Sequence, residues 1–399
     1  MKPLHAQTGF VVPTVIFALA ILGVVAVAAI SLSGDEQRSA RAFRESGLAL
    51  YSAEAGLRKA LGSWDTAGVR TLTPGDSLVV GSGWTALPNH ASYRVVIYKA
   101  DSGQLQQFVV IAQGRRPSQV GGQATVTALV TGVPVFKWGI FTQNGITISG
   151  GGITDGYNSA SGPYNPAAID STGSLATNGN ITLSGGGTAV KGDAAAAGTN
   201  SGGTVTGSRS NGVTAFPAMP TLACPAGGYT PAANVPISSG ITYNAATGVL
   251  TVSGGKNLTL TPPPSQFYFS SLVLSGGSTL TINSGGAHVD IYIDNKLDLS
   301  GGGIVNTAAT PTALGIWACG NPASPQGWTL SGGSGAYFSV YAPNHDITVS
   351  GSGDLYGAIV GRSLNSSGGS KVHYDEALTQ IPSRNLVTVS GSWAEVSAF

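Results

Sequence analysis

The sequence predicts an α+β N-terminal part followed by an all-β C-terminal part. An apolar run over residues 10–32 continues into amphipathic spacing, which predicts a long helix. Alternating strands with turns between them fill residues 63–138, and a short strand followed by Ser-Gly recurs over residues 139–399. We therefore expect the helix to pack on a small antiparallel sheet, and the rest to form a parallel β-solenoid. An antiparallel β-sandwich is the alternative for the C-terminal part, because it places strands at a similar spacing.

The composition restricts the possible partners. Only 9% of the 399 residues are charged, whereas about 25% is usual, and the net charge is +1. This balance gives no electrostatic reason to expect nucleic acid as a partner. The 59 glycines stand among Val, Ile, Leu, Thr and Ser and show no collagen period, which indicates many short strands with tight turns.

The apolar run of residues 10–32 has three interpretations. It contains no charged residue, and as a helix it measures about 34 Å, enough to cross a bilayer core. It can be a permanent membrane anchor. It can be a secretory signal peptide, for which Ala26-Val27-Ala28 offers a cleavage pattern. It can also be a prepilin-type signal that is cut between Gly9 and Phe10, so that residues 1–9 are a leader and the helix stays on the mature protein.

Residues 33–62 favour the last interpretation over a cleaved signal peptide. Their apolar residues follow helical spacing, and Glu54 and Arg58 form an i,i+4 pair. No proline interrupts the span between Thr14 and Asp65. One helix is therefore expected over residues 10–62, with a membrane half over 10–32 and an amphipathic half over 33–62. A cleaved signal peptide gives no reason for such a continuation.

The first 62 residues resemble the type IV pilin superfamily, in particular minor pilins with PilX-like N-termini. The matching features are the short basic leader, Gly9 followed by Phe10, the apolar run, and Ala53-Glu54-Ala55-Gly56-Leu57. The resemblance implies that prepilin peptidase cuts after Gly9 and that Phe10 is N-methylated. It also implies an inner-membrane stage, followed by assembly into an extracellular filament through helix contacts with other pilin subunits.

One position departs from that family. Pilins usually carry Glu five residues into the mature chain, and here that position is Thr14. The resemblance assigns the usual Glu to pairing with a neighbouring subunit's amino terminus, a charge that is costly to leave unpaired in an apolar bundle. Its absence argues against a repeating major subunit and suits a rare component, for example one at a filament tip.

The region over residues 63–138 changes to a strand period. Residues 92–99, 105–112 and 123–131 alternate in the manner of strands, and Asp101-Ser102-Gly103 is a turn between the first two. A small antiparallel sheet is the expected partner for the apolar stripe of the helix.

The region over residues 139–399 repeats one phrase. Later copies stand roughly 17 to 31 residues apart, a range typical of one coil of a solenoid. Residues 188–236 are rich in Gly, Ala, Ser, Thr and Pro and are expected to form a loop insertion. This half also resembles the β-solenoid-like C-terminal regions of some PilX-type proteins. The copies begin at Ile146, Ile181, Leu250, Leu272, Leu297, Trp328, Ile347 and Val387.

The two cysteines, Cys224 and Cys319, lie far apart in the sequence. If this part of the chain lies outside the cytoplasm, they can form a disulfide that ties the insertion to the solenoid. Two free, buried cysteines are the alternative.

The sequence offers candidates for metal binding and acid–base chemistry. Asp290, Asp294 and Asp298 share one face of a strand, where they can bind Ca²⁺, form an acid pair, or simply make a polar outer face. His345, His373 and Asp375 can form a metal site if adjacent coils bring them together; isolated surface histidines are the alternative. No phosphate loop, nucleophile elbow or metalloprotease motif is present. We therefore expect no catalytic residue and no cofactor.

These observations lead to three functional hypotheses. The first is a non-enzymatic minor pilin that displays a solenoid head for adhesion or assembly priming, with a host surface or polysaccharide as a possible ligand. The second is a secreted or surface β-helix enzyme that acts on polysaccharide. The third is a membrane-anchored structural protein. The following aromatic residues can stack on sugar rings or fill the solenoid ends: Tyr157, Tyr164, Trp317, Trp328, Tyr337 and Tyr341.

Overall fold

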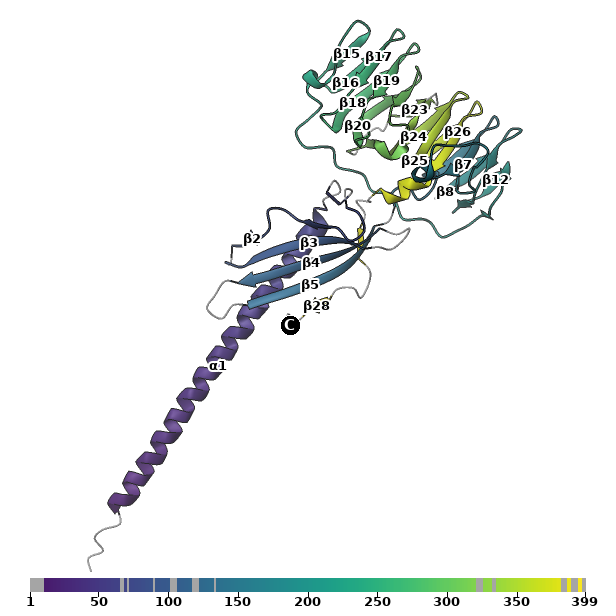
Figure 1. Cartoon of the computed structure of the whole chain (residues 1–399). Coiled ribbons are helices and arrows are strands. Elements are labelled where there is room, and N and C mark those ends of the chain that lie inside the picture. The colour runs from purple at the N-terminus through teal and green to yellow at the C-terminus, as the bar shows by residue number, and fades with distance from the viewer. Residues whose placement is uncertain are drawn as a thin grey trace, which may run out of the picture. The chain divides into compact units, whose positions relative to one another are not determined.

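The chain divides into two compact units. Unit 1 comprises residues 1–132 and 386–399, and unit 2 comprises residues 133–385. The structure is a computed structural model, shown in Figure 1. It describes residues 11–64, 68–69, 72–88, 90–100, 106–116, 122–132, 134–320, 326–331, 335–381, 386–388 and 394–396.

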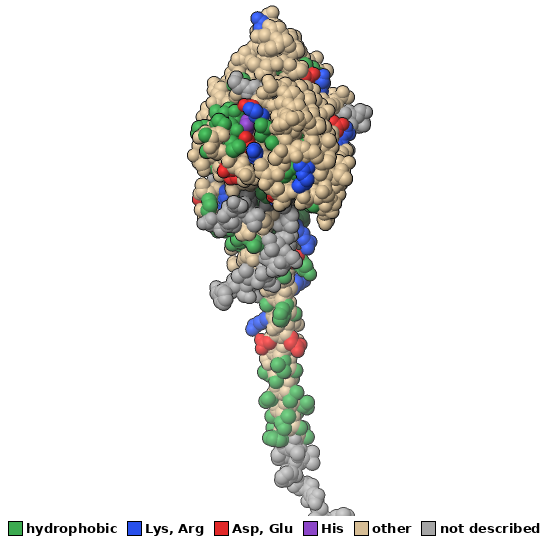
Figure 2. Space-filling view, turned by 90° about the vertical axis from the view of Figure 1, so that its right-hand side faces the viewer, with side chains coloured by type: hydrophobic (Ala, Val, Ile, Leu, Met, Phe, Trp, Pro, Cys, Tyr) green, Lys and Arg blue, Asp and Glu red, His purple; other side chains and the backbone are tan. Residues whose placement is uncertain are grey.

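Unit 1 begins with one continuous helix, α1 (Val11–Gly62), so the single long helix expected from the sequence is confirmed. Its large apolar side chains between Val15 and Leu32 are exposed, Ile30 most of all at 74%. They form the green stretch of the helix in Figure 2. In the described part of the chain, one helix is long and apolar enough to cross a membrane by length and composition. This is α1, whose most apolar window has a mean hydropathy of 2.9 and buries none of its surface within the chain.

The other half of α1 packs on an antiparallel sheet. Ala53, Leu57 and Ala60 of the helix are buried against Val95, Val110 and Val126 of the sheet, among others. The sheet has the central order β1-β3-β4-β5-β27, with β2 paired to β3 and β28 paired to β5. Its strands are β1 (Ser77–Val79), β2 (Thr85–Ala86), β3 (Ser92–Ala100), β4 (Gln106–Arg116), β5 (Gly122–Gly132), β27 (Leu386–Thr388) and β28 (Ala394–Val396).

Glycines let the helix backbone approach this sheet closely. A Cβ atom built on Gly114 would lie 1.9 Å from the carbonyl oxygen of Ala49, and one on Gly122 would lie 2.3 Å from that of Glu45. Close beside this contact, Arg116 forms an ion pair with Glu45 at 3.1 Å, and both side chains are largely buried. Glycine is therefore required here for close packing rather than for a turn.

The last strands of the chain do not belong to the repeat region, contrary to the expected 139–399 boundary. β27 pairs with β5 antiparallel, and so does β28. Val387-Thr388-Val389-Ser390 has the same alternation of apolar and polar residues as the repeated phrase. Its described part nevertheless lies in the sheet of unit 1. Unit 2 is thus inserted between two neighbouring strands of unit 1.

Unit 2 is built from stacked parallel strands. In the described residues its named strand pairs are parallel except for β15 with β16, so the pairing does not support the antiparallel sandwich. The first part of unit 2 contains β6 (Ile140–Ile148), β7 (Ile153–Tyr157), η1 (Ser159–Ser161), β8 (Leu175–Thr177), β9 (Asn180–Leu183), β10 (Ala189–Val190), β11 (Ala194–Ala196), β12 (Asn200–Gly202), β13 (Thr204–Val205) and β14 (Arg209–Ser210). The second part contains η2 (Ala232–Asn234), β15 (Ile241–Asn244), β16 (Val249–Val252), β17 (Asn257–Leu260), β18 (Gln266–Leu274), β19 (Thr279–Ile282), β20 (Val289–Asp298), β21 (Ile304–Asn306), η3 (Pro311–Ala313), β22 (Leu314–Ala318), β23 (Trp328–Ser331), β24 (Tyr337–Ser350), β25 (Asp354–Ser366), β26 (Lys371–Asp375) and η4 (Glu376–Gln380).

The chain enters and leaves this stack in its middle. β6 and β7, the first strands of unit 2, pair with β25 and β26, the last. From β6 the pairing continues through β8, β11 and β14 towards one end of the stack. From β25 it continues through β24, β22, β20, β18 and β16 to β15 at the other end. Figure 1 shows β15 and β12 near opposite ends of unit 2.

The repeated phrases lie in register with one another. Ile181, Ile146, Leu364 and Ile347 are successive partners across four strands, all buried in one apolar core. After β6 and β9 the chain turns at Gly150 and Gly185, which have φ angles of 70° and 85°. These left-handed angles favour glycine at the turns. The repeat therefore encodes a column of equivalent side chains along the core.

Residues 188–236 do not form a single loop insertion as expected. Their first part contributes β10 to β14, where small side chains such as Ala194 and Ala196 are buried in the core. The remainder, residues 211–236, which we name the crossing segment, carries the chain from β14, which pairs with β11 at one end of the stack, to β15, which pairs with β16 at the other. Within it the described structure has one short helical turn, η2, and no strand.

Candidate functional site

The predicted processing site lies at the N-terminal edge of the structure. Gly9 and Phe10 fall outside the described residues. Thr14 lies in α1, and its side chain is not among those described. The predicted cleavage and methylation therefore stay predictions.

Cys224 and Cys319 are joined by a disulfide, one of the two arrangements that the sequence left open. The bond fastens the crossing segment to Cys319, the residue directly after β22, and Leu222 also forms a parallel bridge with Cys319. Two further bonds hold the segment nearby. Tyr341 donates a hydrogen bond to the Pro220 carbonyl at 2.6 Å, and Asn344 donates one to the Thr221 hydroxyl at 2.8 Å.

The crossing segment covers a row of aromatic side chains. Tyr268, Tyr292, Trp317 and Tyr341 are successive partners on β18, β20, β22 and β24, so they form a row across the strands. They pack in one cluster with Phe216, Met219 and Leu222 of the crossing segment. Trp317 and Tyr341, named above as possible sugar-stacking residues, are thus buried under the chain's own segment.

The carboxylates of Asp290, Asp294 and Asp298 have separate hydrogen-bond and ion-pair partners. Asp290 accepts hydrogen bonds from His288 at 2.7 Å and from the Trp317 indole at 2.6 Å. Asp298 forms an ion pair with Lys296 at 3.1 Å. In the described residues no group of three or more His, Cys, Asp or Glu side chains is arranged to hold a metal ion.

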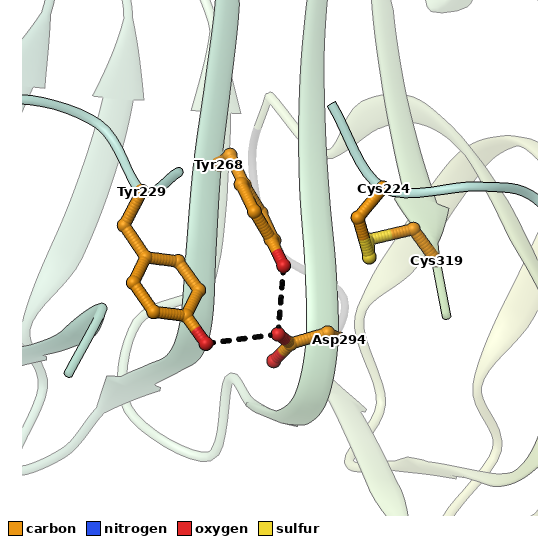
Figure 3. Close-up of a disulfide and its surroundings, with 5 residues drawn as sticks. All are labelled: Cys224, Tyr229, Tyr268, Asp294 and Cys319. Carbon is orange, nitrogen blue, oxygen red and sulfur yellow. Dashed lines mark hydrogen bonds between the residues drawn. A yellow bond between two sulfur atoms is a disulfide. The ribbon is translucent and has the colours of Figure 1, made fainter. Parts of the chain in front are cut away.

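Asp294 joins the crossing segment to the stack. Its Oδ2 accepts a hydrogen bond from Tyr229 of the crossing segment at 3.0 Å and one from Tyr268 of β18 at 2.8 Å. Figure 3 shows both hydroxyl groups converging on this carboxylate, with the disulfide nearby. Burial and the bond to Asp294 raise the pKa of both tyrosines, so the phenols stay protonated and can donate. This arrangement fits a structural role, in which Asp294 holds the crossing segment against the strands of unit 2.

His345 and His373 are not brought together as a metal site. His345 is fully buried, bonds the Gln326 carbonyl at 2.8 Å through Nδ1, and packs on Trp328. Burial lowers its pKa, which keeps the ring neutral. His373 on β26 is a register partner of Tyr356 on β25, and Tyr356 is a partner of Tyr337 on β24. His345 is also on β24 but eight residues after Tyr337, so the register does not align the two histidines.

His373 instead belongs to a group of aromatic side chains that we name the tyrosine cluster: Tyr157, Tyr164, Tyr337, Tyr356 and His373. Register places Tyr337, Tyr356 and His373 side by side on β24, β25 and β26. The rings of Tyr337 and Tyr356 are stacked with centroids 4.4 Å apart, and those of Tyr356 and His373 with centroids 4.8 Å apart. Tyr337, Tyr356 and Tyr164 are partly exposed.

Carboxylates hold the cluster in place. Asp155 of β7 bonds His373 Nδ1 at 2.6 Å and accepts from the Tyr164 hydroxyl at 2.9 Å. His373 Nε2 lies 3.7 Å from Asp354. Asp375 accepts from the Ser159 hydroxyl at 2.6 Å and from its amide at 2.9 Å, and burial raises its pKa. The cluster thus lies where the first and last coils of unit 2 meet.

The sequence interpretation named Tyr157, Tyr164 and Tyr337 but missed Tyr356, Asp354 and Asp155. The sequence did contain a signal: Asp354 and Tyr356 are two residues apart, as are Lys371 and His373, so each pair would share one face of a strand. Figure 2 shows a face of unit 2 on which apolar, acidic, basic and histidine side chains gather, whereas much of the remaining surface in that view is uncharged.

Comparison with known proteins gives limited matches. A family model described as a domain of unknown function (DUF7305) matches residues 270–381. No curated protein sequence matches the chain significantly. Among solved structures, the competence-associated pilin ComZ from Thermus thermophilus matches with 14% identity and a TM-score of 0.26, over 88% of this chain and 97% of that chain. A TM-score at this level carries no argument about the fold.

Proposed function

We propose that the chain is a minor pilin-like subunit of a type IV pilus or a related filament or secretion system. The observation that carries this proposal is the division of α1. Its first half exposes apolar side chains all round, and its second half packs on an antiparallel sheet through Ala53, Gly56 and Leu57, within the phrase that resembles pilins. An exposed apolar helix of this length needs a membrane or other helices to cover it.

In this proposal, prepilin peptidase cuts after Gly9, Phe10 is methylated, and α1 passes from the inner membrane into the core of a filament. Thr14 in place of the usual Glu suits a rare subunit rather than a repeating one. Unit 2 is displayed outside the cell as a non-enzymatic head that serves adhesion or assembly priming. The separate partners of Asp290, Asp294 and Asp298 favour structural roles for these carboxylates over an acid pair.

We further interpret unit 2 as an interrupted β-solenoid. The parallel pairing, the in-register apolar column and the glycine turns support this interpretation. It differs from a simple solenoid in that its coils extend from the middle towards both ends, and a crossing segment connects the ends.

N-terminal mass spectrometry of the mature protein tests the proposal. We expect a chain that begins with N-methylated Phe10 and that co-purifies with sheared filaments. Gly9→Val should leave the leader attached and remove the protein from the filament fraction. The matched control is Gly23→Ala in α1, where an added Cβ meets nothing within 4 Å. A mature chain that begins near Ala29 would lack the helix and would refute the proposal.

A further inference from the structure

We propose that the tyrosine cluster of unit 2, together with Asp354 and Lys371, binds a neutral glycan chain. This inference rests on the proposed function in one respect: binding would serve adhesion only if unit 2 is displayed outside the cell. Binding itself is a property of the purified protein, so the two proposals can fail separately.

Two parallel rows of side chains form the site. Tyr337, Tyr356 and His373 make the aromatic row, in which Tyr337 and Tyr356 are partly exposed and His373 is buried behind them, with 2% of its surface exposed. Asp354 and Lys371 stand two residues earlier on β25 and β26 and are register partners of each other. Alternation along a strand places residues i and i+2 on the same face, so the charged row and the aromatic row lie beside each other, about 7 Å apart. This spacing suits a pyranose ring that contacts both rows.

The aromatic row offers apolar surface with polar edges. Tyr337 and Tyr356 stack on each other, and both side chains stay partly exposed. Burial and the charge of Asp354 raise the pKa of Tyr356, so its hydroxyl stays a hydrogen-bond donor at neutral pH. Tyrosine suits surfaces that must contact a partly apolar, hydroxyl-rich ligand.

The charged row offers a matched acceptor and donor. Asp354 and Lys371 lie 3.7 Å apart, and their side chains are 35% and 42% exposed. At that exposure the ion pair contributes little to stability, so it can rearrange to bond a ligand. A carboxylate and an ammonium group side by side fit two neighbouring hydroxyl groups of a sugar, one as donor and one as acceptor.

The charge balance selects against anionic glycans. Asp155 and Asp354 contribute two carboxyl groups around the cluster, against the ammonium group of Lys371, whereas burial raises the pKa of the third carboxyl group, that of Asp375. These acidic surroundings would repel a sulfated or carboxylated sugar, whereas a neutral hexose or an N-acetylated hexose carries no charge to be repelled. The site therefore favours neutral chains.

The test uses the full chain, purified in a detergent without a sugar headgroup, on an array of neutral tetrasaccharides built from glucose, galactose, mannose or N-acetylglucosamine. A heparin tetrasaccharide is the anionic comparison. We expect at least one neutral tetrasaccharide to bind at millimolar concentration or below, and heparin to bind more weakly. Binding of none of the neutral probes, or preferred binding of heparin, would overturn the proposal.

Variants then locate the site. Tyr356→Ala and the nearly isosteric Asp354→Asn should each weaken binding about tenfold, the loss expected for one good contact or charge-assisted hydrogen bond. Tyr268→Phe, which removes a hydroxyl at the crossing segment, is the matched control and should leave binding unchanged. Asp354→Asn keeps the shape of the side chain, so it remains informative if Tyr356→Ala fails to fold. Unchanged binding in folded Asp354→Asn and Tyr337→Ala proteins would place the glycan elsewhere and refute this site.

Discussion

Gly132 at the end of β5 and Leu386 at the start of β27 are register partners in an antiparallel pair, although all of unit 2 lies between them in the sequence. Partners in such a pair have Cα atoms about 5 Å apart, which a two-residue turn can span. Unit 2 thus replaces what could be an ordinary hairpin turn.

This relationship predicts that unit 1 folds without unit 2. We expect a protein in which Asn-Gly replaces residues 133–385 to form a type I′ hairpin between β5 and β27. Circular dichroism in detergent should show helix and sheet together, and the amides of β4 and β5 should be protected from hydrogen exchange.

A second deletion that removes residues 133–399 is the control for this experiment. It leaves β5 without β27 and β28, so its β5 amides should exchange faster. Equal exchange in the two deletions would show that the C-terminal strands contribute nothing to unit 1.

Gly114→Ala should destabilise unit 1. The new Cβ would lie 1.9 Å from the backbone oxygen of Ala49, and neither the helix nor β4 can move at that point without losing buried contacts. Overpacking of this kind costs about 1–3 kcal/mol. Thermal or denaturant unfolding of the two-residue-turn version of unit 1 measures the loss.

Gly47→Ala on the same helix provides the comparison. There an added Cβ meets nothing within 4 Å, so the substitution should stabilise the helix by up to about 1 kcal/mol. If both substitutions changed the free energy of unfolding equally, the close approach of α1 to β4 would be wrong.

Loss of the disulfide should destabilise unit 2. The bond closes a loop of 95 residues between Cys224 and Cys319, and Cys224→Ala removes it. A loop of this length typically contributes about 2–4 kcal/mol, in part by restricting the unfolded chain. Denaturant unfolding followed by near-ultraviolet circular dichroism of the buried aromatic row should show an earlier midpoint.

A reducing agent distinguishes the bond from the cysteine side chain. It should lower the midpoint of the unaltered protein and leave that of Cys224→Ala unchanged. A midpoint of the unaltered protein that is insensitive to reduction would mean that the crossing segment is held by its other contacts alone.

The ion pair of Asp346 and Arg362 predicts an acid-sensitive contribution to stability. Hydrogen bonds from Arg362 lower the pKa of Asp346 below its ordinary value. The stabilising contribution is therefore complete above the unfolded pKa of about 3.9 and is lost as pH falls through the lower, folded pKa. Asp346→Asn should destabilise the protein at pH 7 and have little effect near pH 2. Unfolding free energies at both values check this, and an equal effect at both would contradict it.

The sequence predicted elements whose pattern is local. The helix followed from the spacing of apolar residues up to Leu61, and the paired strands of unit 1 followed from alternation around Asp101-Ser102-Gly103. The equivalence of the phrases at Ile146, Ile181 and Ile347 likewise followed from their shared pattern, and register confirms that they align.

Pairing between strands that are far apart in the sequence could not be predicted in the same way, because a local pattern does not name the partner. Val387-Thr388-Val389 has the same alternation as the coil strands, and only its pairing with β5 distinguishes it. Ala194 and Ala196 lack the large apolar side chains that mark a core strand, so β11 resembled a loop. The tyrosine cluster depends on His373 and Asp155 meeting across two coils that are far apart in the sequence.

The position of β6 in the middle of the stack has a consequence for biogenesis. During synthesis β6 emerges early, but one edge of that strand stays open until β25 and β26, which come far later in the sequence, have emerged. An open parallel edge of this kind is a template for pairing with the wrong chain. We expect unit 2 to be prone to mispairing at this edge until its last coil has been synthesised.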